Sequence, residues 1–391
     1  MTSGKKNLLF FLSFILIASA CFQLEASSFI MRIFSLGSKL VFLLSFLWAV
    51  KHITDKKFRY LFLLVVFMIF LIYTTMRNSF DIVRIIPIFM KVMGVVLLMT
   101  PYMVRYNREV INILAKVYTI IIGLNFLQMI IFPSAFGDGY LIANNYNQFG
   151  SIIIATVLLA YLDYKYTRKK LTMYFRFFIS VATVAIPGSL TSTMAMIMLI
   201  LYFLLVKSVK LRKLGIYSLF LFVILFFSLF VVGQSVIYYN PKFTELMDMV
   251  GKDVTFSGRT PMWMNTLLRI AYSPIFGHGF YTNDWALFNI RGVNSHNIIL
   301  NLFLQGGVIL FALFLIVVIY VIRQVNKAGD RVNKLELLFS FMVFMLMSQL
   351  EVYHYSMIFL FFFVLIIGSY YNKPIITRRD EYIDNSSRSS D

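Results

Sequence analysis

The chain alternates between long apolar segments and short polar connections from its first residues to its last. Each apolar segment is long enough to cross about 30 Å of hydrocarbon as a helix. We therefore predict an all-α, polytopic membrane protein with twelve transmembrane helices. The predicted spans are 8–26, 33–50, 59–75, 82–100, 111–132, 147–163, 172–188, 190–206, 214–234, 296–322, 335–350 and 355–371.

The placement of the charges predicts how these spans are oriented. The net charge of +19 first suggests a nucleic-acid partner. However, 24 of the 36 Lys and Arg side chains fall on alternate connections and at both termini, whereas the short connections on the other side hold only Arg32 and Arg77. Both termini are therefore predicted to be cytoplasmic, in a multi-pass protein of the plasma membrane. The excess charge reflects topology, so we predict no nucleic-acid partner.

The chain reads as one membrane domain, residues 1–372, followed by a polar cytoplasmic tail, residues 373–391, that we expect to be disordered. Residues 5–21 resemble a signal peptide, with "ASAC" ending at Cys21, but another span follows almost at once. We interpret them as the first span. Cys21 is the only cysteine, so no internal disulfide is expected.

One predicted outer connection, residues 235–294, is far longer than the others, and loops of this length are usually functional. It contains a helix signal in "SGRTPMWMNTLLRIAYSP", with Thr260 as the N-cap and Pro261 in the first turn. Trp263 and Ile270 share one face of this helix. Such a face is expected of a helix that lies on the membrane surface or packs over the bundle.

The stretch "NSHNIILNLFLQGG" places a histidine where the tenth predicted span begins. With Asn294 or Ser295 as the N-cap, His296 would lie in the first helical turn, where the helix dipole disfavours the imidazolium form. A neutral imidazole is what a general base requires. We predict that His296 removes a proton from an attacking hydroxyl. The alternative is a hydrogen-bonded histidine with a structural role.

Two cations lie within the fourth predicted span. Arg84 and Lys91 are seven residues apart and share a helical face, with Pro87 between them. A charge at the depth of Lys91 requires a polar cavity or a partner. Either an acidic residue such as Asp81 neutralises the pair, or the pair forms an anion site open to the outer face. Other cations near span ends can extend to the interface: Lys39, Lys116 and Arg176.

Two loop arginines, Arg259 and Arg291, extend this candidate anion site. One base with several cations indicates a phosphorylated or pyrophosphorylated substrate at the outer leaflet. We predict neither a metal nor a cofactor. The candidate metal ligands show no recognisable spacing; they are His278, Asp284, His296 and His354. The glycine-rich "GHGF" and "QGG" lack the strand-loop-helix setting of a nucleotide-binding loop.

These motifs resemble the signature region of the O-antigen ligase and polymerase family, of the Wzy and WaaL type. "NNYNQFGS", with Asn147, is similar to a second element of that family. The chain departs from the family at "TSTMAM", where Thr193 stands in place of a frequent arginine. The residues that carry the main resemblance are Gly258, Arg259, Trp263, Pro274, Gly277, Gly279, His296, Asn297, Gly306 and Gly307.

The resemblance implies a GT-C-type glycosyltransferase that moves a glycan from undecaprenyl diphosphate to an acceptor hydroxyl, with inversion and without a metal. It implies His296 as the base, Arg259 as a diphosphate ligand, and Asn297 and Asn147 as substrate-binding residues. Its implied partners are a lipid-linked donor and acceptor, the bilayer, a flippase and a chain-length regulator. We expect a capsule or O-antigen repeat-unit polymerase.

Two alternatives remain open at this point. A ligase would pass finished glycan to a lipid, a wall polymer or a protein by the same donor chemistry. An anion or polysaccharide transporter would use Arg84 and Lys91 as a translocation site and would need no base.

Overall fold

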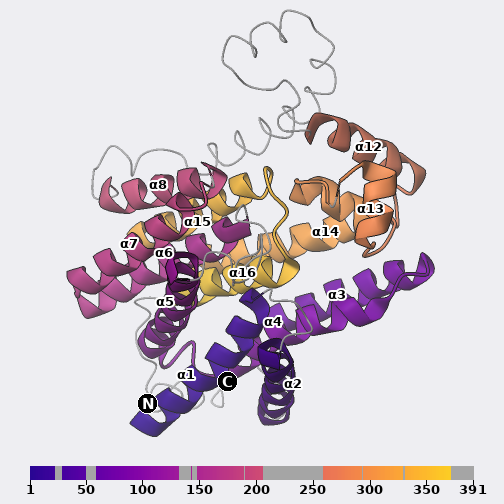
Figure 1. Cartoon of the computed structure of the whole chain (residues 1–391). Helices are drawn as coiled ribbons and strands as arrows, with labels where there is room; N and C mark the ends of the chain where they lie inside the picture. The colour runs from indigo at the N-terminus through magenta and orange to yellow at the C-terminus, as the bar shows by residue number, and fades with distance from the viewer. Residues whose placement is uncertain are drawn as a thin grey trace, which may run out of the picture.

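The computed structural model describes residues 1–22, 29–49, 59–131, 142, 148–188, 190–205, 259–292, 294–328 and 331–370 (Figure 1). Within these ranges every regular element is a helix, which confirms the predicted all-α class. Eleven of the twelve predicted spans overlap a helix, and the ninth, 214–234, lies outside the described residues. The bundle helices are α1 (Ser3–Cys21), α2 (Phe29–Ala49), α3 (Arg59–Arg77), α4 (Ile85–Met99), α5 (Asn107–Ile131), α6 (Phe149–Thr167), α7 (Lys170–Ala185), α8 (Leu190–Leu205), α14 (Ile298–Asn326), α15 (Arg331–Met347) and α16 (Tyr355–Ser369).

The lengths of these helices support a membrane protein. Six described segments are long and apolar enough to cross a bilayer: Ser3–Cys21, Arg59–Arg77, Ile82–Met99, Asn107–Ile131, Phe149–Thr167 and Ile298–Asn326. Two shorter apolar helices accompany them, Ser192–Phe203 and Tyr355–Ser369. The full number of twelve spans stays a prediction.

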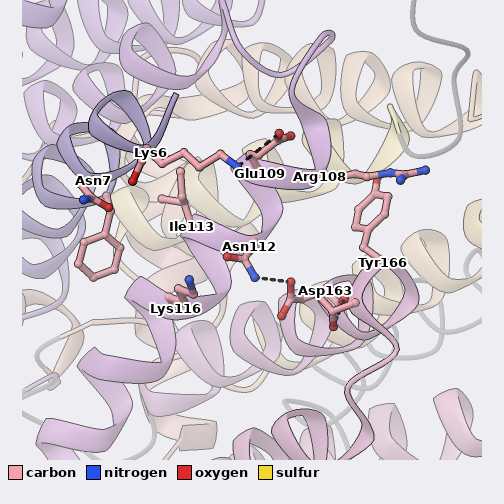
Figure 2. Close-up of a pocket in the computed structure, with 12 residues that line it drawn as sticks. Lys6, Asn7, Arg108, Glu109, Asn112, Ile113, Lys116, Asp163 and Tyr166 are labelled. Carbon is pink, nitrogen blue, oxygen red and sulfur yellow. Dashed lines mark hydrogen bonds and ion pairs between the residues drawn. The ribbon is translucent and has the colours of Figure 1, made fainter. Parts of the chain in front are cut away.

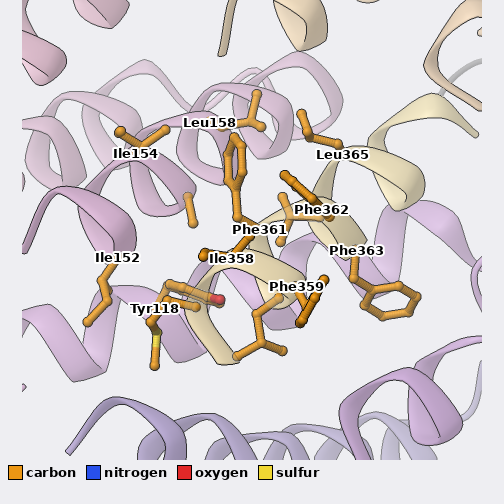
Figure 3. Packing of buried hydrophobic residues seen from close by; sticks show 14 of the residues in the cluster. Tyr118, Ile152, Ile154, Leu158, Ile358, Phe359, Phe361, Phe362, Phe363 and Leu365 are labelled. Atoms are coloured by element: carbon orange, nitrogen blue, oxygen red, sulfur yellow. The ribbon is translucent and has the colours of Figure 1, made fainter. Parts of the chain in front are cut away.

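Helix α16 lies at the centre of the bundle. All of its residues are buried, and it packs against α4, α5, α6, α14 and α15. Phe361 lies near Leu158 of α6 (Figure 3), and its ring stacks on Phe344 of α15 at 4.2 Å between centroids. A helix that is apolar on all faces belongs in an interior. Because α16 is held on every side, the connection that precedes it, residues 348–354, has a fixed position.

Helix α14 is interrupted at Gly307, whose backbone has φ 61° and ψ −158°. A loop segment fills the interruption: Val308 N–H donates to Pro274 O at 2.8 Å, and His278 N–H donates to Leu304 O at 2.7 Å. Irregular backbone within a membrane requires partners of this kind, since no water is present to supply them. The loop is therefore joined to α14 below the predicted membrane surface.

The glycines at this junction are needed because the two backbones nearly touch. A Cβ atom at Gly277 would lie 2.4 Å from the Gly306 nitrogen, and one at Gly307 would lie 2.2 Å from the Ile275 carbonyl carbon. Both glycines also have positive φ, which other residues rarely adopt. The motifs "GHGF" and "QGG" thus form two halves of one backbone contact.

The described part of the outer loop contains two helices, α12 (Arg259–Tyr272) and α13 (Asn283–Ile290). The sequence predicted α12, which begins at Arg259, but not α13, whose N-cap is Thr282. The Trp263 side chain is buried against Leu300 of α14, and its indole N–H donates to Ser295 O at 2.8 Å. Of the two predicted settings for α12, the structure therefore has the helix packed over the bundle.

Candidate active site

A cavity of about 480 Å³, here called the outer pocket, lies where several helix ends meet. These ends belong to connections that the charge pattern assigns to one side of the membrane, the predicted outer side. Arg84 enters from η3 (Ile82–Arg84), the short 3₁₀ helix before α4, and Gln148 from the start of α6. The remaining lining residues are Ile88, Phe280, Tyr281, Asn283, Asn294, His296, Asn301, Gln305, Glu351, Val352, Tyr353, His354 and Tyr355.

A histidine–carboxylate pair lies in the lining of the outer pocket. The Nδ1 atom of His296 lies 3.0 Å from Oε1 of Glu351, and Glu351 is buried, with 1% of its side chain exposed, against 21% for His296. When Nδ1–H donates to the carboxylate, Nε2 keeps its lone pair and can accept a proton. A carboxylate in this position fixes the tautomer and the orientation of the imidazole ring.

The start of α14 differs from the prediction. The N-cap is Asn297, whose side chain accepts hydrogen bonds from the N–H groups of Ile299 at 2.9 Å and Leu300 at 3.0 Å. His296 therefore precedes the helix rather than lying in its first turn, and its φ of 45° is left-handed. The Asn294 side chain accepts from His296 N–H at 2.8 Å, which stabilises this turn. Asn294, Ser295 and Asn297 all have capping side chains, and the structure uses Asn297.

Arg259 contacts the same carboxylate. Its Nη2 is 3.7 Å from Oε2 of Glu351, so this buried acid contacts both residues that the sequence proposed as base and phosphate ligand. The sequence did not single out Glu351. It stands in the short connection "SQLEVYHYS" between two apolar segments. A single acidic residue between two apolar spans could have indicated a functional side chain.

The two predicted intramembrane cations are separated in the structure. Arg84 is exposed and lines the outer pocket, whereas Nζ of Lys91 donates to the carbonyl oxygen of Ser19 in the last turn of α1. A cation at a helix C-terminus is stabilised by the helix dipole. Asp81, the acid suggested as a neutralising partner, instead accepts a hydrogen bond from Val83 N–H at 2.8 Å. Pro87 lies in the first turn of α4, where its missing N–H removes no helical hydrogen bond.

The remaining predicted site residues have other surroundings. Arg291 is exposed and ends α13 in the left-handed conformation. The Asn297 amide group caps α14 and donates to Gln349 O at 3.1 Å, so both ends of its side chain have partners in the backbone. Asn147 lies outside the described residues. In the part of the chain that the structure describes, no group of three or more His, Cys, Asp and Glu residues could hold a metal ion.

A second cavity of about 550 Å³, here called the inner pocket, lies at helix ends predicted to face the cytoplasm (Figure 2). Its two carboxylates have partners: Glu109 lies 3.7 Å from Lys6, and Asp163 accepts from the Asn112 amide at 2.8 Å. Asp163 also forms a buried ion pair with Arg176 at 2.6 Å. The prediction that Arg176 extends to the interface was therefore wrong, because α7 turns this side chain toward α6.

The fold and the outer pocket define a helical membrane protein with a histidine–carboxylate pair beside arginines. Residues 175–315 match the model of a protein family described as O-antigen ligase. The match includes Arg259 and His296 and confirms the resemblance drawn from the motifs. It indicates a protein of O-antigen ligase or polymerase type, whose family implies lipid-linked glycan substrates. A search of curated proteins gave no match.

Proposed function

We propose that this chain is a GT-C-type membrane glycosyltransferase that joins undecaprenyl-diphosphate-linked oligosaccharide repeat units at the outer face of the plasma membrane. The observation that supports this proposal is the buried Glu351–His296 pair, which opens into the polar outer pocket at predicted outer helix ends. The family match over residues 175–315 supports the same type of reaction.

In the proposed reaction, Nε2 of His296 removes the proton from a hydroxyl of the acceptor sugar. The hydroxyl oxygen attacks the anomeric carbon of the donor, and the bond from that carbon to the diphosphate oxygen breaks, with inversion. The departing undecaprenyl diphosphate takes the bonding electrons, and Arg84 at the pocket rim stabilises its charge. Glu351 stabilises the imidazolium that forms. The proposed mechanism needs no metal.

Arg259 has a double role in this proposal. By resemblance it is a diphosphate ligand, and its contact with Glu351 at 3.7 Å also helps to hold the carboxylate beside His296. Asn147, which the resemblance assigns to the substrate, stays a prediction. Lys91, Arg291 and Asn297 have no substrate contact in the proposal, because the structure gives each of them other surroundings.

The two other candidates differ from the polymerase in their products. A ligase would add a single finished glycan to a different acceptor by the same donor chemistry, and the family match includes this reaction type. A transporter would move substrate without forming a glycosidic bond, and it would not need the buried carboxylate that holds His296.

The test is chain extension by the purified protein in lipid nanodiscs with authentic lipid-linked repeat units, with and without a chelator. A ladder of products that grows by whole repeat units and survives the chelator supports the polymerase. A single addition to a lipid or wall-polymer acceptor supports the ligase. Flux across proteoliposomes without any new glycosidic bond would overturn the assignment to a glycosyltransferase.

A further inference from the structure

One wall of the outer pocket consists of uncharged amide groups on α14. Asn301 and Gln305 are four residues apart, so both face the same side of the helix. Both are buried, with 4% and 5% of their surface exposed, and yet both line the outer pocket. Gln305 lies seven residues after the start of α14, which is about 10 Å below the helix end. Polar side chains at this depth of an apolar helix need a reason.

A hydrogen-bond network fixes how these amides are oriented. The Tyr281 hydroxyl donates to Asn301 Oδ1 at 2.8 Å, and the Tyr355 hydroxyl donates to Gln305 Oε1 at 2.7 Å. The Gln305 amide N–H donates to the same Asn301 oxygen at 3.5 Å. Burial raises the pKa of the Tyr281 hydroxyl, so it remains a donor. Both amide oxygens are thus occupied.

The Asn301 side-chain nitrogen, Nδ2, makes no hydrogen bond within this network. Among the described residues this nitrogen has no hydrogen-bond partner, and it is not fully buried. It is therefore accessible from the outer pocket, as two N–H donors. A donor group held in place by Tyr281 and by the buried Tyr355 offers hydrogen bonds to oxygen atoms of a ligand.

The charge around this wall favours a neutral ligand over a diphosphate. Glu351 also lines the outer pocket and would repel an anion, whereas the pocket-lining cation Arg84 is exposed. A sugar ring is neutral and also carries hydroxyls. One hydroxyl can accept a hydrogen bond from the Asn301 amide, and another can donate to Nε2 of His296. Tyr281 and Phe280 also line the pocket and can pack against the C–H face of a sugar.

We propose that Asn301, oriented by Gln305, Tyr281 and Tyr355, binds the uncharged sugar that carries the attacking hydroxyl. This inference rests on the proposed function for the identity of that sugar as the acceptor. The donor diphosphate is bound by the arginines of the proposed mechanism, Arg84 and Arg259, and not by this wall. The amide network is then a specificity element for the acceptor.

A binding measurement tests the proposal separately from catalysis. The probes are a neutral trisaccharide of hexose and N-acetylhexosamine on a short alkyl chain, and inorganic diphosphate, each titrated into purified protein in nanodiscs. Asn301→Asp keeps the oxygen that accepts from Tyr281 and Gln305 but removes the N–H donors. We expect it to weaken trisaccharide binding about five- to tenfold, the value of one or two neutral hydrogen bonds.

Two further variants separate binding from folding. Tyr355→Phe adds no charge and removes the hydrogen bond to the Gln305 amide oxygen, so Gln305 no longer orients Asn301 as firmly. We expect trisaccharide affinity to fall about two- to threefold, with unchanged diphosphate affinity. Asn289→Asp on α13 is the matched control, since its amide donates to Trp285 O outside the pocket, and it should bind both probes as the wild type does.

The proposal is overturned if the wild type binds no neutral trisaccharide, or if Asn301→Asp and Tyr355→Phe bind it normally and only lose thermal stability. Loss of diphosphate affinity in Tyr355→Phe would instead assign the wall to the anion. If the wild type binds the trisaccharide but forms no glycosidic bond, the sugar-binding role of Asn301 is supported and the proposed glycosyltransferase function is overturned.

Discussion

The outer and inner pockets both hold buried carboxylates, but their partners differ. In the inner pocket Asp163 faces Arg176 at 2.6 Å, and the guanidinium keeps its charge at every physiological pH. In the outer pocket Glu351 faces His296 at 3.0 Å, and a neutral imidazole has one ring nitrogen that can accept a proton. A buried acid thus pairs with an arginine in the inner pocket and with a histidine in the outer pocket, where our proposal uses the pair for proton transfer.

The number of hydrogen bonds to each carboxylate separates the pockets further. Asp163 is held from both sides, by Arg176 and by the Asn112 amide at 2.8 Å. Glu351 has Arg259 as its second partner, at the longer distance of 3.7 Å. The comparison predicts that damage to the inner pair lowers stability, whereas damage to the outer pair lowers transfer.

The largest predicted effect on stability comes from the inner pocket. Arg176→Met leaves Asp163 buried without its cation, which should lower the free energy of unfolding by about 3–5 kcal/mol. Transfer by the folded fraction should stay normal. Lys6→Met is the control, because its partner Glu109 lies 3.7 Å away at a half-exposed site and such pairs contribute at most about 1 kcal/mol. Thermal unfolding in nanodiscs measures both, and equal stabilities would remove the distinction between these pairs.

A smaller effect is expected where the loop joins α14. Gly277→Ala places a Cβ atom 2.4 Å from the Gly306 nitrogen at a φ of +63°, so we expect a loss of about 1–3 kcal/mol together with reduced transfer. Gly123→Ala in α5 is the matched control, because a Cβ there meets no atom within 4 Å and alanine favours a helix. If the two variants unfold at the same temperature, the junction does not hold the loop.

The smallest effect distinguishes the two cations of the fourth predicted span. Arg84→Ala should raise the KM for the lipid-diphosphate donor about three- to tenfold, since an exposed charge contributes about 1 kcal/mol. Lys91→Met should leave that KM unchanged, because Lys91 contacts the end of α1. Steady-state rates over a range of donor concentrations measure both. An increase in KM for Lys91→Met alone would reverse their roles.

The helices could be predicted from the sequence because span length and apolar content are local properties. The start of α14 could not, since Asn294, Ser295 and Asn297 all have capping side chains and packing against Gln349 decides among them. Helix α13 was missed because its eight residues carry too little apolar periodicity. These failures occur where the polar residues are close together, which is also where the outer pocket forms.

The candidate site could be predicted in part. His296 and Arg259 were found from their positions in motifs, but Glu351 lies 55 residues beyond His296 on a different connection. No local pattern shows which connections meet, and the central position of α16 brings this one to the outer pocket. Likewise, a shared helical face predicted that Arg84 and Lys91 act together, but Arg84 is exposed at the outer pocket whereas Lys91 donates to Ser19 O at the end of α1.

The most direct test of the central claim, that Glu351 and His296 act as one proton-transfer unit, is a double-mutant cycle on the transfer rate. We predict that His296→Ala lowers the rate at least about a hundredfold and Glu351→Gln about tenfold, with the folded state retained in both. The double variant should then be no slower than His296→Ala, because the carboxylate acts only through the imidazole. Losses that multiply, or normal transfer by His296→Ala, would contradict the account.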